Sequence, residues 1–358
     1  MSTPAKKTAQ KSISLALQGG GSHGAMTWGV LDAVLEDERL RIRGVSGTSA
    51  GAMNAAVLAD GYARGGREGA RAALRAFWKA VSDGARFSPI SRSAWNRLTG
   101  DFSLDNSPGY LFFDNLTRVF SPYDLNPSGA NPLREILDSV VDFGNVNKCA
   151  EIEVFVTATN VRTGRPRIFR QGEVTADAVL ASACLPQMFP AVEIDGEAYW
   201  DGGFVGNPAL YPLIQLDCPD IVVVQINPIV RDKVPQSARD IINRVNEISF
   251  NSALIKELQA INLAQRLIGT GEFGRYGKTY LHMIHGDDDA HDLAASSKLN
   301  AEWKFLDFLY GRGRALAREW IETHFDRIGV ASTLDLDEII EDAPRPRVTA
   351  APDPAETS

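Results

Sequence analysis

Short strands and helices alternate along most of this 358-residue chain, and this alternation constrains its fold more than any other feature. Runs rich in β-branched residues predict strands at 13–18, 41–45, 151–157, 221–227 and 279–284. Apolar residues at helical spacing, or a high alanine content, predict helices at 25–37, 50–60, 175–183, 237–268 and 301–324. Alternation of this kind is typical of a largely parallel sheet with helices on both faces.

The stretch from residue 77 to residue 123 interrupts the alternation, and its polar composition predicts loops. It nevertheless carries the aromatic residues Phe77, Trp78, Phe87, Trp95, Phe102, Tyr110, Phe112, Phe113, Phe120 and Tyr123. Such rings are expected either in a cap or lid over an apolar site or in an insertion that they anchor to the core. We predict one domain over residues 12–341 with a cap-like insertion at about 84–147, a flexible tail at 1–11 and a disordered tail at 342–358.

The junction between the second strand and the second helix reads Gly47-Thr48-Ser49-Ala50-Gly51. A serine in this position sits on a sharp turn that exposes its hydroxyl, and the helix that follows directs free amides toward the reacting oxygen. Glycines at 47 and 51 fit because strand and helix approach too closely there for a side chain. The G-x-S-x-G pattern also occurs by chance, so a purely structural turn is the alternative to a nucleophilic serine.

A second glycine-rich sequence, Gln18-Gly19-Gly20-Gly21-Ser22-His23-Gly24, joins the first strand to the first helix. Its glycines satisfy the dinucleotide-binding pattern G-x-G-x-x-G, which needs an acidic residue at the end of the next strand to hold a ribose. That strand ends at Arg43-Gly44-Val45-Ser46, without an acidic residue. We therefore favour an oxyanion hole, in which successive glycine amides turn toward a developing negative oxygen.

In a third sequence, Trp200-Asp201-Gly202-Gly203, the aspartate comes just after an expected apolar strand. An aspartate before two glycines lies on a tight turn with a well-fixed carboxylate. Taken alone it predicts an Asx-type turn. Beside the other two motifs it favours a catalytic carboxylate.

In this order, the three sequences resemble the motifs of the patatin-like phospholipase family, and the resemblance extends from about residue 13 to the strand near Thr279. It implies a three-layer α/β/α fold with a mostly parallel central sheet, related to the α/β-hydrolases. It also implies a dyad of Ser49 as nucleophile and Asp201 as general base. The implied oxyanion hole comprises Gly19, Gly20, Gly21, Gly24 and Ala50, with support from Gly47, Gly51, Gly202 and Gly203.

The resemblance further implies hydrolysis of lipid acyl esters, as in phospholipases A, lysophospholipases or esterases, with neither cofactor nor metal. One residue departs from the family pattern, which usually has Arg or Lys where this chain has His23. A fixed positive charge near the glycine-rich loop is therefore either lost or made pH-dependent.

Histidines near the C-terminal part provide an alternative mechanism. The chain order Ser, Asp, His is that of the α/β-hydrolase triads, which His282 or His285 would complete. Residues 282–292 are also rich in His and Asp, as in some metal sites, but we favour a strand end followed by a solvated acidic loop. A non-catalytic lipid-binding protein on the same fold is a further alternative.

A net charge of -8 argues against nucleic-acid binding, which requires a basic surface. Cys149, Cys184 and Cys218 are too few and too scattered for a disulfide framework or a zinc site, so we expect buried thiols. Neither a signal peptide nor a membrane-spanning segment is predicted. We expect a cytoplasmic protein that acts on a lipid or acyl-ester substrate, with peripheral membrane contact and oligomeric state left open.

Overall fold

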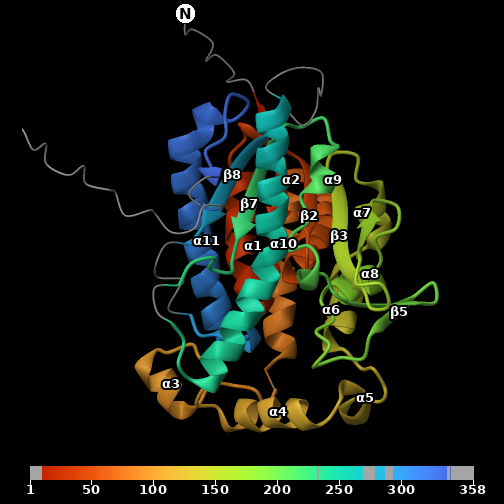
Figure 1. Cartoon of the computed structure of the whole chain (residues 1–358), viewed down its shortest axis with the longest axis vertical. Helices are drawn as coiled ribbons and strands as arrows, with labels where there is room; N and C mark the ends of the chain where they lie inside the picture. Colours follow the sequence, from red (N-terminus) through yellow and green to blue (C-terminus); the bar gives the residue numbers. More distant parts are fainter. Residues whose placement is uncertain are drawn as a thin grey trace, which may run out of the picture.

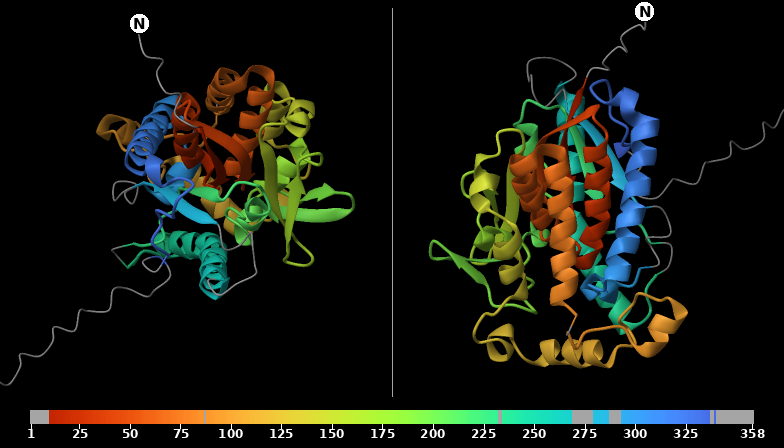
Figure 2. Two further views of the ribbon diagram at one scale, coloured as in Figure 1. Left: turned by 90° about the horizontal axis from the view of Figure 1, so that it is seen from above. Right: turned by 180° about the vertical axis from the view of Figure 1, so that it is seen from behind.

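This computed structural model describes residues 10–86, 88–231, 234–268, 279–286, 293–336 and 339. Four predicted features lie wholly or largely outside these residues. They are the tail at 342–358, nearly all of the tail at 1–11, Phe87 and the acidic segment 287–292. Within them, eight strands form one sheet in the order β5-β6-β3-β2-β1-β7-β8, with β4 paired to β3. Helices flank the sheet on both faces (Figure 1, Figure 2). The predicted fold class, a mostly parallel sheet between helical layers, is confirmed.

The parallel part of the described sheet consists of the strands that the sequence pattern predicts. They are β1 (Lys11–Leu17), β2 (Leu40–Gly47), β3 (Glu153–Asn160), β7 (Asp220–Gln225) and β8 (Tyr280–His285). The pattern missed the short antiparallel strands β4 (Pro166–Arg170) and β5 (Val192–Ile194). The apolar strand expected before Asp201 is β6 (Glu197–Asp201), which pairs antiparallel with β3 and β5. The turn between β5 and β6 is Asp195-Gly196, with positive φ at both residues, and this Asp-Gly pair was a readable hairpin signal.

Alternate residues of the central strands face two separate apolar cores. Leu15 and Leu17 of β1 belong to the larger core, whereas Ala16 between them belongs to the smaller one. The larger core includes residues of α1 (Gly24–Glu36), α2 (Ala50–Gly84), α8 (Ala176–Ser182) and α11 (Trp303–His324), and the smaller one residues of α9 (Tyr211–Ile214) and α10 (Ala238–Ile268). Because β1 and β7 are buried on both faces at their centres, residues 15–17 and 221–224 are all apolar.

The helix after β2 is much longer than predicted and folds back on itself. Gly65 and Gly66 interrupt α2 with non-helical backbone angles. Beyond this bend the helix packs against its own first half, so closely that a Cβ on Gly61 would lie 2.6 Å from the Cβ of Ala73. The two halves therefore form an antiparallel hairpin, and the second half returns toward the end of the molecule where α2 begins.

The prediction of loops between residues 77 and 123 is wrong. The chain continues from α2 into α3 (Ala94–Thr99), α4 (Pro108–Val119) and α5 (Pro122–Leu125). Ser93, Ser107 and Ser121 cap these helices, each accepting a hydrogen bond from the backbone amide three residues on. A proline follows two of these serines at the first helical position. These caps were readable signals, but α3 and α5 are too short to show apolar periodicity.

The predicted insertion at about 84–147 has two parts that differ in their packing. Its second part forms α6 (Pro132–Val140) and α7 (Phe143–Lys148), and Leu137 and Val146 of these helices are buried in the larger core. Its first part, α3 to α5, crosses one end of the molecule, at the bottom of Figure 1. Only this first part therefore has the position expected of a cap.

Cys149, Cys184 and Cys218 are buried free thiols, as the sequence predicted. Burial raises the pKa of Cys184 to about 12, and the nearby charge of Asp201 acts in the same direction. This thiol therefore stays protonated and does not compete as a nucleophile. None of the helices in the described part of the chain is long and apolar enough to cross a bilayer.

Candidate active site

Ser49 lies on the bend between β2 and α2, in a backbone conformation that residues other than glycine rarely adopt. Its φ is 55° and its ψ is -122°. A Cβ on Gly47 would overlap the backbone of Gly51, and a Cβ on Gly51 would overlap the carbonyl oxygen of Leu17 in β1. Both glycines are therefore required by the close approach of strand and helix, as the sequence predicted.

Asp201 reaches Ser49 through the order of the strands. It ends β6, where it pairs with Ala158 of β3, and β3 lies beside β2. The side chain of Ser49 is close enough to the Asp201 carboxylate to lower the pKa of that carboxyl. The amide of Gly203 donates a hydrogen bond of 2.7 Å to Oδ1. The Asx-type turn, one of the two alternatives that the sequence left, is present, and the carboxylate lies beside the serine.

The Asp201 carboxyl is only 3% exposed. This burial raises its pKa from 3.8 to about 7, because the Gly203 hydrogen bond and the Ser49 side chain, which lower the pKa, do not offset the loss of hydration. A carboxylate with such a pKa can accept a proton near neutral pH.

The glycine-rich loop approaches Ser49 directly, but two of its glycine amides are already engaged. A Cβ on Gly19 would lie 2.7 Å from the Cβ of Ser49, and the Gly19 amide donates a 2.7 Å hydrogen bond to Asn207 Oδ1. The amide of Gly24 bonds back to carbonyls of its own helical turn, and a Cβ on Gly24 would lie 2.7 Å from that of Ala50. Gly19 and Gly24 therefore allow close packing and do not present a free N–H.

The other predicted donors are Gly20, Gly21 and Ala50. Gly21 has a φ of 57°, in the region that favours glycine, and begins the short 3-10 helix η1 (Gly21–His23). Ala50 is the first residue of α2. Among the described residues, none of these three amides has a hydrogen-bond acceptor in the protein. These amides are thus available for a ligand oxygen.

Buried amide side chains hold the glycine-rich loop in place, and the sequence analysis missed them. Gln18 Oε1 accepts hydrogen bonds from the backbone amides of Ile226 and Asn227, at 2.8 and 2.9 Å. Asn227 Nδ2 in turn donates to the carbonyl oxygen of Gly19, at 2.8 Å. Gln18 and Asn227 follow the neighbouring strands β1 and β7, and polar residues at the carboxyl ends of parallel strands were the signal that could have found them.

Lys298 contacts the same loop from the 3-10 helix η5 (Ala295–Leu299). Its Nζ donates a 2.7 Å hydrogen bond to Oδ1 of Asn227, the residue that binds the Gly19 carbonyl. Its own carbonyl oxygen lies where a Cβ on Gly21 would be. Lys298 therefore fixes the loop at two points and places a cationic group next to it.

His23 does not supply a charge at this loop. Its Nε2 lies 2.8 Å from Ser297 Oγ, and that hydroxyl donates to the carbonyl oxygen of Ala294. Nε2 must therefore carry the proton that Ser297 accepts. Burial lowers the pKa of His23 to about 3, with further lowering by the charges of Lys298 and Arg231. The sequence left two possibilities at position 23, a lost charge and a pH-dependent one. The first holds near neutral pH, where His23 is uncharged.

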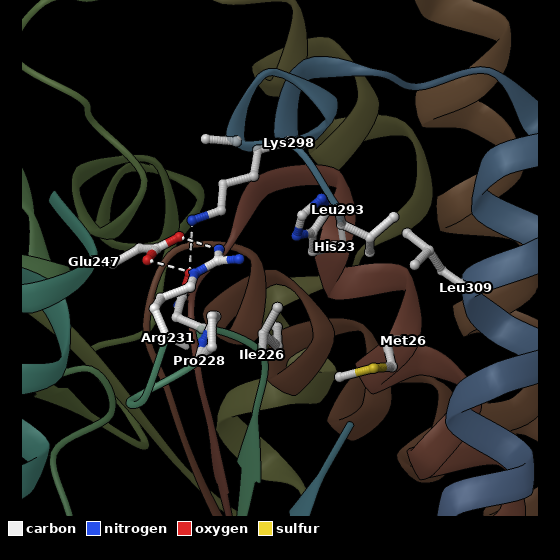
Figure 3. A pocket seen from close by; sticks show the side chains of 11 residues that line it. His23, Met26, Ile226, Pro228, Arg231, Glu247, Leu293, Lys298 and Leu309 are labelled. Atoms are coloured by element: carbon white, nitrogen blue, oxygen red, sulfur yellow. Dashed lines mark hydrogen bonds and ion pairs between the residues drawn. The ribbon is translucent and has the colours of Figure 1, made fainter. Parts of the chain in front are cut away.

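A small pocket lies between His23 and Lys298 (Figure 3). Its volume of about 20 Å³ is enough for about one water molecule. Arg231 and Glu247, beside the Lys298 side chain, form a 2.6 Å ion pair. The cations around the pocket are thus partly neutralised by one carboxylate.

The two histidines of the alternative triad lie away from Ser49. Both are on β8, which β7 and β1 separate from β2, so three spacings of about 4.8 Å lie between the strands. His282 is fully buried, with Asp220 Oδ1 at 3.0 Å and Thr333 Oγ1 at 2.9 Å from its ring nitrogens. His282 is therefore a core residue, and the structure does not bring it or the exposed His285 to the serine. The strand end expected in residues 282–292 is that of β8, and the acidic part, which also has the composition of some metal sites, lies outside the described residues.

This arrangement is typical of α/β serine hydrolases: a serine lies on a strained bend between a strand and a helix, beside a glycine-rich loop from the neighbouring strand. The comparison with known families is more specific. This chain belongs to the patatin-like phospholipase family, whose sequence model matches residues 15–214. The match includes the glycine-rich loop, the serine bend and the Asp-Gly-Gly turn.

Two curated proteins are similar to this chain over part of their length. An uncharacterized protein, R571, of Acanthamoeba polyphaga mimivirus is 24% identical over 229 residues, which are 60% of this chain and 65% of that protein. Lysophospholipase nte1 of Aspergillus terreus is 26% identical over 265 residues, which are 72% of this chain and 15% of that protein. The chain thus spans under two thirds of the viral protein and a small part of the fungal one.

Two solved structures are similar with low sequence identity. VipD from Legionella pneumophila is 15% identical with a TM-score of 0.41, over 92% of this chain and 73% of that one. ExoU from Pseudomonas aeruginosa, solved in complex with SpcU, is 13% identical with a TM-score of 0.26, over 93% of this chain and 67% of that one.

Proposed function

We propose that this chain is a lipid acyl hydrolase in which Ser49 is the nucleophile and Asp201 the general base. The observation that carries the proposal is a buried carboxylate beside the Ser49 side chain, whose pKa is raised to about 7. Such a base is matched to proton transfer near neutral pH. Membership in the patatin-like phospholipase family, and the similarity to a fungal protein named as a lysophospholipase, support lipid esters as substrates.

In the proposed reaction, Ser49 Oγ forms a bond to the ester carbonyl carbon while its proton passes to Asp201. The carbonyl oxygen becomes negative and is stabilised by the amides of Gly20, Gly21 and Ala50. The tetrahedral intermediate breaks its bond to the alcohol oxygen, which takes the proton from Asp201, and the acyl chain stays on Ser49. A water molecule then attacks the acyl-enzyme, Asp201 takes its proton, and that proton returns to Ser49 as the fatty acid leaves.

The test is hydrolysis of a phospholipid, a lysophospholipid and a water-soluble acyl ester by the variants Ser49→Ala and Asp201→Asn. Each substitution should lower kcat/KM by about a thousandfold or more, because the two groups act in the same step. Circular dichroism checks that both variants are folded. Full activity in either variant would contradict the dyad.

A fluorophosphonate probe separates a hydrolase from a non-catalytic lipid-binding protein, because it labels only an activated serine. We expect labelling of the wild type and none of Ser49→Ala.

His285→Ala tests the triad. It should leave activity unchanged, since β8 is three strands from β2.

A further inference from the structure

Residues 94–125, which contain α3, α4 and α5, form a strap across one end of the molecule (Figure 1, Figure 2). On one side the strap is attached next to the glycine-rich loop. The amide of Leu104 donates a 3.0 Å hydrogen bond to Ser296 Oγ in η5, and Asn300 Nδ2 donates a 2.9 Å hydrogen bond to the carbonyl oxygen of Phe102. This is the same short helix whose Lys298 contacts Gly21.

On its other side the strap is attached next to the hairpin that carries Asp201. The amide of Ala191, just before β5, donates a 3.2 Å hydrogen bond to the hydroxyl of Tyr123 in α5. The strap therefore connects the two segments that flank the proposed active site. It lies at the end of the sheet that carries Ser49.

The outer surface of the strap is apolar and uncovered. No residue of α4 is buried, although half of this helix is apolar. Phe112 and Val119, two turns apart on α4, are 68% and 77% exposed. The other large exposed apolar side chains of the strap are Trp95, Leu98, Phe120, Tyr123 and Leu125. Soluble monomeric proteins rarely expose so many large apolar side chains on one continuous segment, which marks a binding surface.

The charges of the strap indicate what kind of surface it can meet. It contains no lysine, and its cations are Arg97 and Arg118, against Asp101, Asp105, Asp114 and Asp124. Arg118 forms a 3.1 Å ion pair with Asp114, and Arg97 lies 3.5 Å from Glu302. A segment that binds anionic lipids by charge needs a cluster of free cations. The strap has a slight excess of negative charge, in a chain whose net charge is -8.

We propose that the outer face of the strap docks on the surface of a zwitterionic phospholipid membrane and so holds the Ser49 end of the protein against it. This proposal rests on the proposed function, because lipid esters are concentrated in such surfaces. Tryptophan and tyrosine are favoured at the boundary between acyl chains and headgroups, and an amphipathic helix with exposed apolar residues lies in that plane. Binding by apolar insertion is expected to depend little on salt.

The test measures binding to phosphatidylcholine vesicles in the Ser49→Ala background, so that no lipid is consumed. The double variant Phe112→Ser/Val119→Ser should bind at least about tenfold more weakly than its parent, because it removes two apolar side chains that would insert into the membrane. Val330→Ser is the matched control. Val330 is 63% exposed and follows the C-terminal end of α11, whereas the strap is tied to the segment before the start of α11. The control should bind like its parent.

Addition of phosphatidylglycerol to the vesicles should weaken binding or leave it unchanged, because the strap lacks free cations. Equal binding by the double variant and its parent would overturn the proposal. So would tighter binding to anionic vesicles, which would assign the contact to charge. If the parent is an oligomer that the double variant dissociates, with vesicle binding unchanged, the surface belongs to a second copy of the chain and the proposal is overturned.

Hydrolysis of a water-soluble ester distinguishes failure of the docking proposal from failure of the proposed function. The double variant, with Ser49 intact, should retain this hydrolysis and lose hydrolysis of vesicle lipids. If the soluble ester is cleaved equally well by Ser49→Ala, the proposed function fails, whatever the vesicles show. If the double variant cleaves vesicle lipids as fast as the Val330→Ser control, docking through the strap fails while the hydrolase remains.

Discussion

The backbone amide of Ser49 donates a 2.9 Å hydrogen bond to the Oγ of Ser182, a fully buried residue at the end of α8. This bond links the proposed nucleophile to a helix that contacts β3 and shares the larger core with α2. It also means that the Ser49 amide is engaged, so that the free amides at the site are those of Gly20, Gly21 and Ala50. A backbone conformation with positive φ persists only when its surroundings hold it, and Ser182 is one of the groups that do so.

Ser182→Ala should therefore lower kcat and leave KM nearly unchanged. The substitution leaves a poorly hydrated amide without an acceptor, which costs about 1–3 kcal/mol, so kcat should fall by about tenfold. The rate of fluorophosphonate labelling should fall in parallel. Ser182→Thr keeps the acceptor oxygen and should recover most of the loss. Loss in both variants to the same degree would mean that packing at this position matters and the hydrogen bond does not.

The pKa of Asp201 predicts how activity depends on pH. A base must be unprotonated, and burial raises the pKa of this carboxyl to about 7. We expect kcat/KM to fall about tenfold for each pH unit below about 7 and to be constant above it. His23→Gln keeps a donor for Ser297 and should not change this profile, since the pKa of His23 is lowered to about 3. If the transition disappears in His23→Gln, it belongs to the histidine.

The same pKa predicts an effect on stability with the opposite trend. The native carboxyl binds its proton more tightly than the unfolded one, whose pKa is near 3.8. The native state therefore holds more protons between about pH 4 and 7, and the free energy of unfolding falls as pH rises through that range. Asp201→Asn should raise the unfolding free energy above about pH 7 by at most about 4 kcal/mol, and by little below about pH 4. Denaturant unfolding at both ends of the range measures this. A gain of equal size at both ends would contradict the assigned pKa.

Gly51→Ala should unfold the serine bend. Its new methyl group would overlap the carbonyl oxygen of Leu17 and lie 2.9 Å from that of Gln18, and backbone atoms of a central strand cannot move aside. We expect a loss of about 3 kcal/mol in stability and of nearly all activity. Gly311→Ala is the control, because nothing lies within 4 Å of its Cβ position inside α11. This control should gain about 0.5–1 kcal/mol, and thermal unfolding measures both.

Lys298→Met should reduce kcat without abolishing it. Burial lowers the pKa of Lys298, with opposing contributions from Glu247 and Arg231, and its Nζ binds Asn227, which holds the Gly19 carbonyl. Loss of a hydrogen bond from a charged group costs about 1.5–3 kcal/mol, so kcat should fall by about tenfold or more. Lys304→Met, an exposed lysine at the start of α11, is the matched control and should leave kcat unchanged. Equal rates for the two variants would mean that Lys298 does not position the loop.

Much of the fold and the site followed from local sequence patterns. The residues of β1, α1, β2 and the start of α2 carry their own periodicity, because each is buried along one or both faces. The three motifs are local as well: glycines at 47 and 51 are dictated by a bend of a few residues, and the Asp201 turn by its two following glycines. Short pieces such as α3, α5 and β5 were missed because they bury too little to impose a period, and only their capping residues or turn glycines mark them.

Local sequence was enough to single out the candidate catalytic residues, since the serine bend and the glycine-rich loop each occupy consecutive positions. The tertiary structure alone decided which groups support them. Ser182, Asn227 and Lys298 are far from Ser49 in the chain and belong to no motif. They meet the site because the sheet order places β3 and β7 beside the central strands, and such long-range contacts leave no periodic trace in the sequence. Sheet order also brings Asp201 to Ser49 and keeps the histidines away from it, because β6 is bonded to the neighbour of β2 while β8 lies beyond β1 and β7.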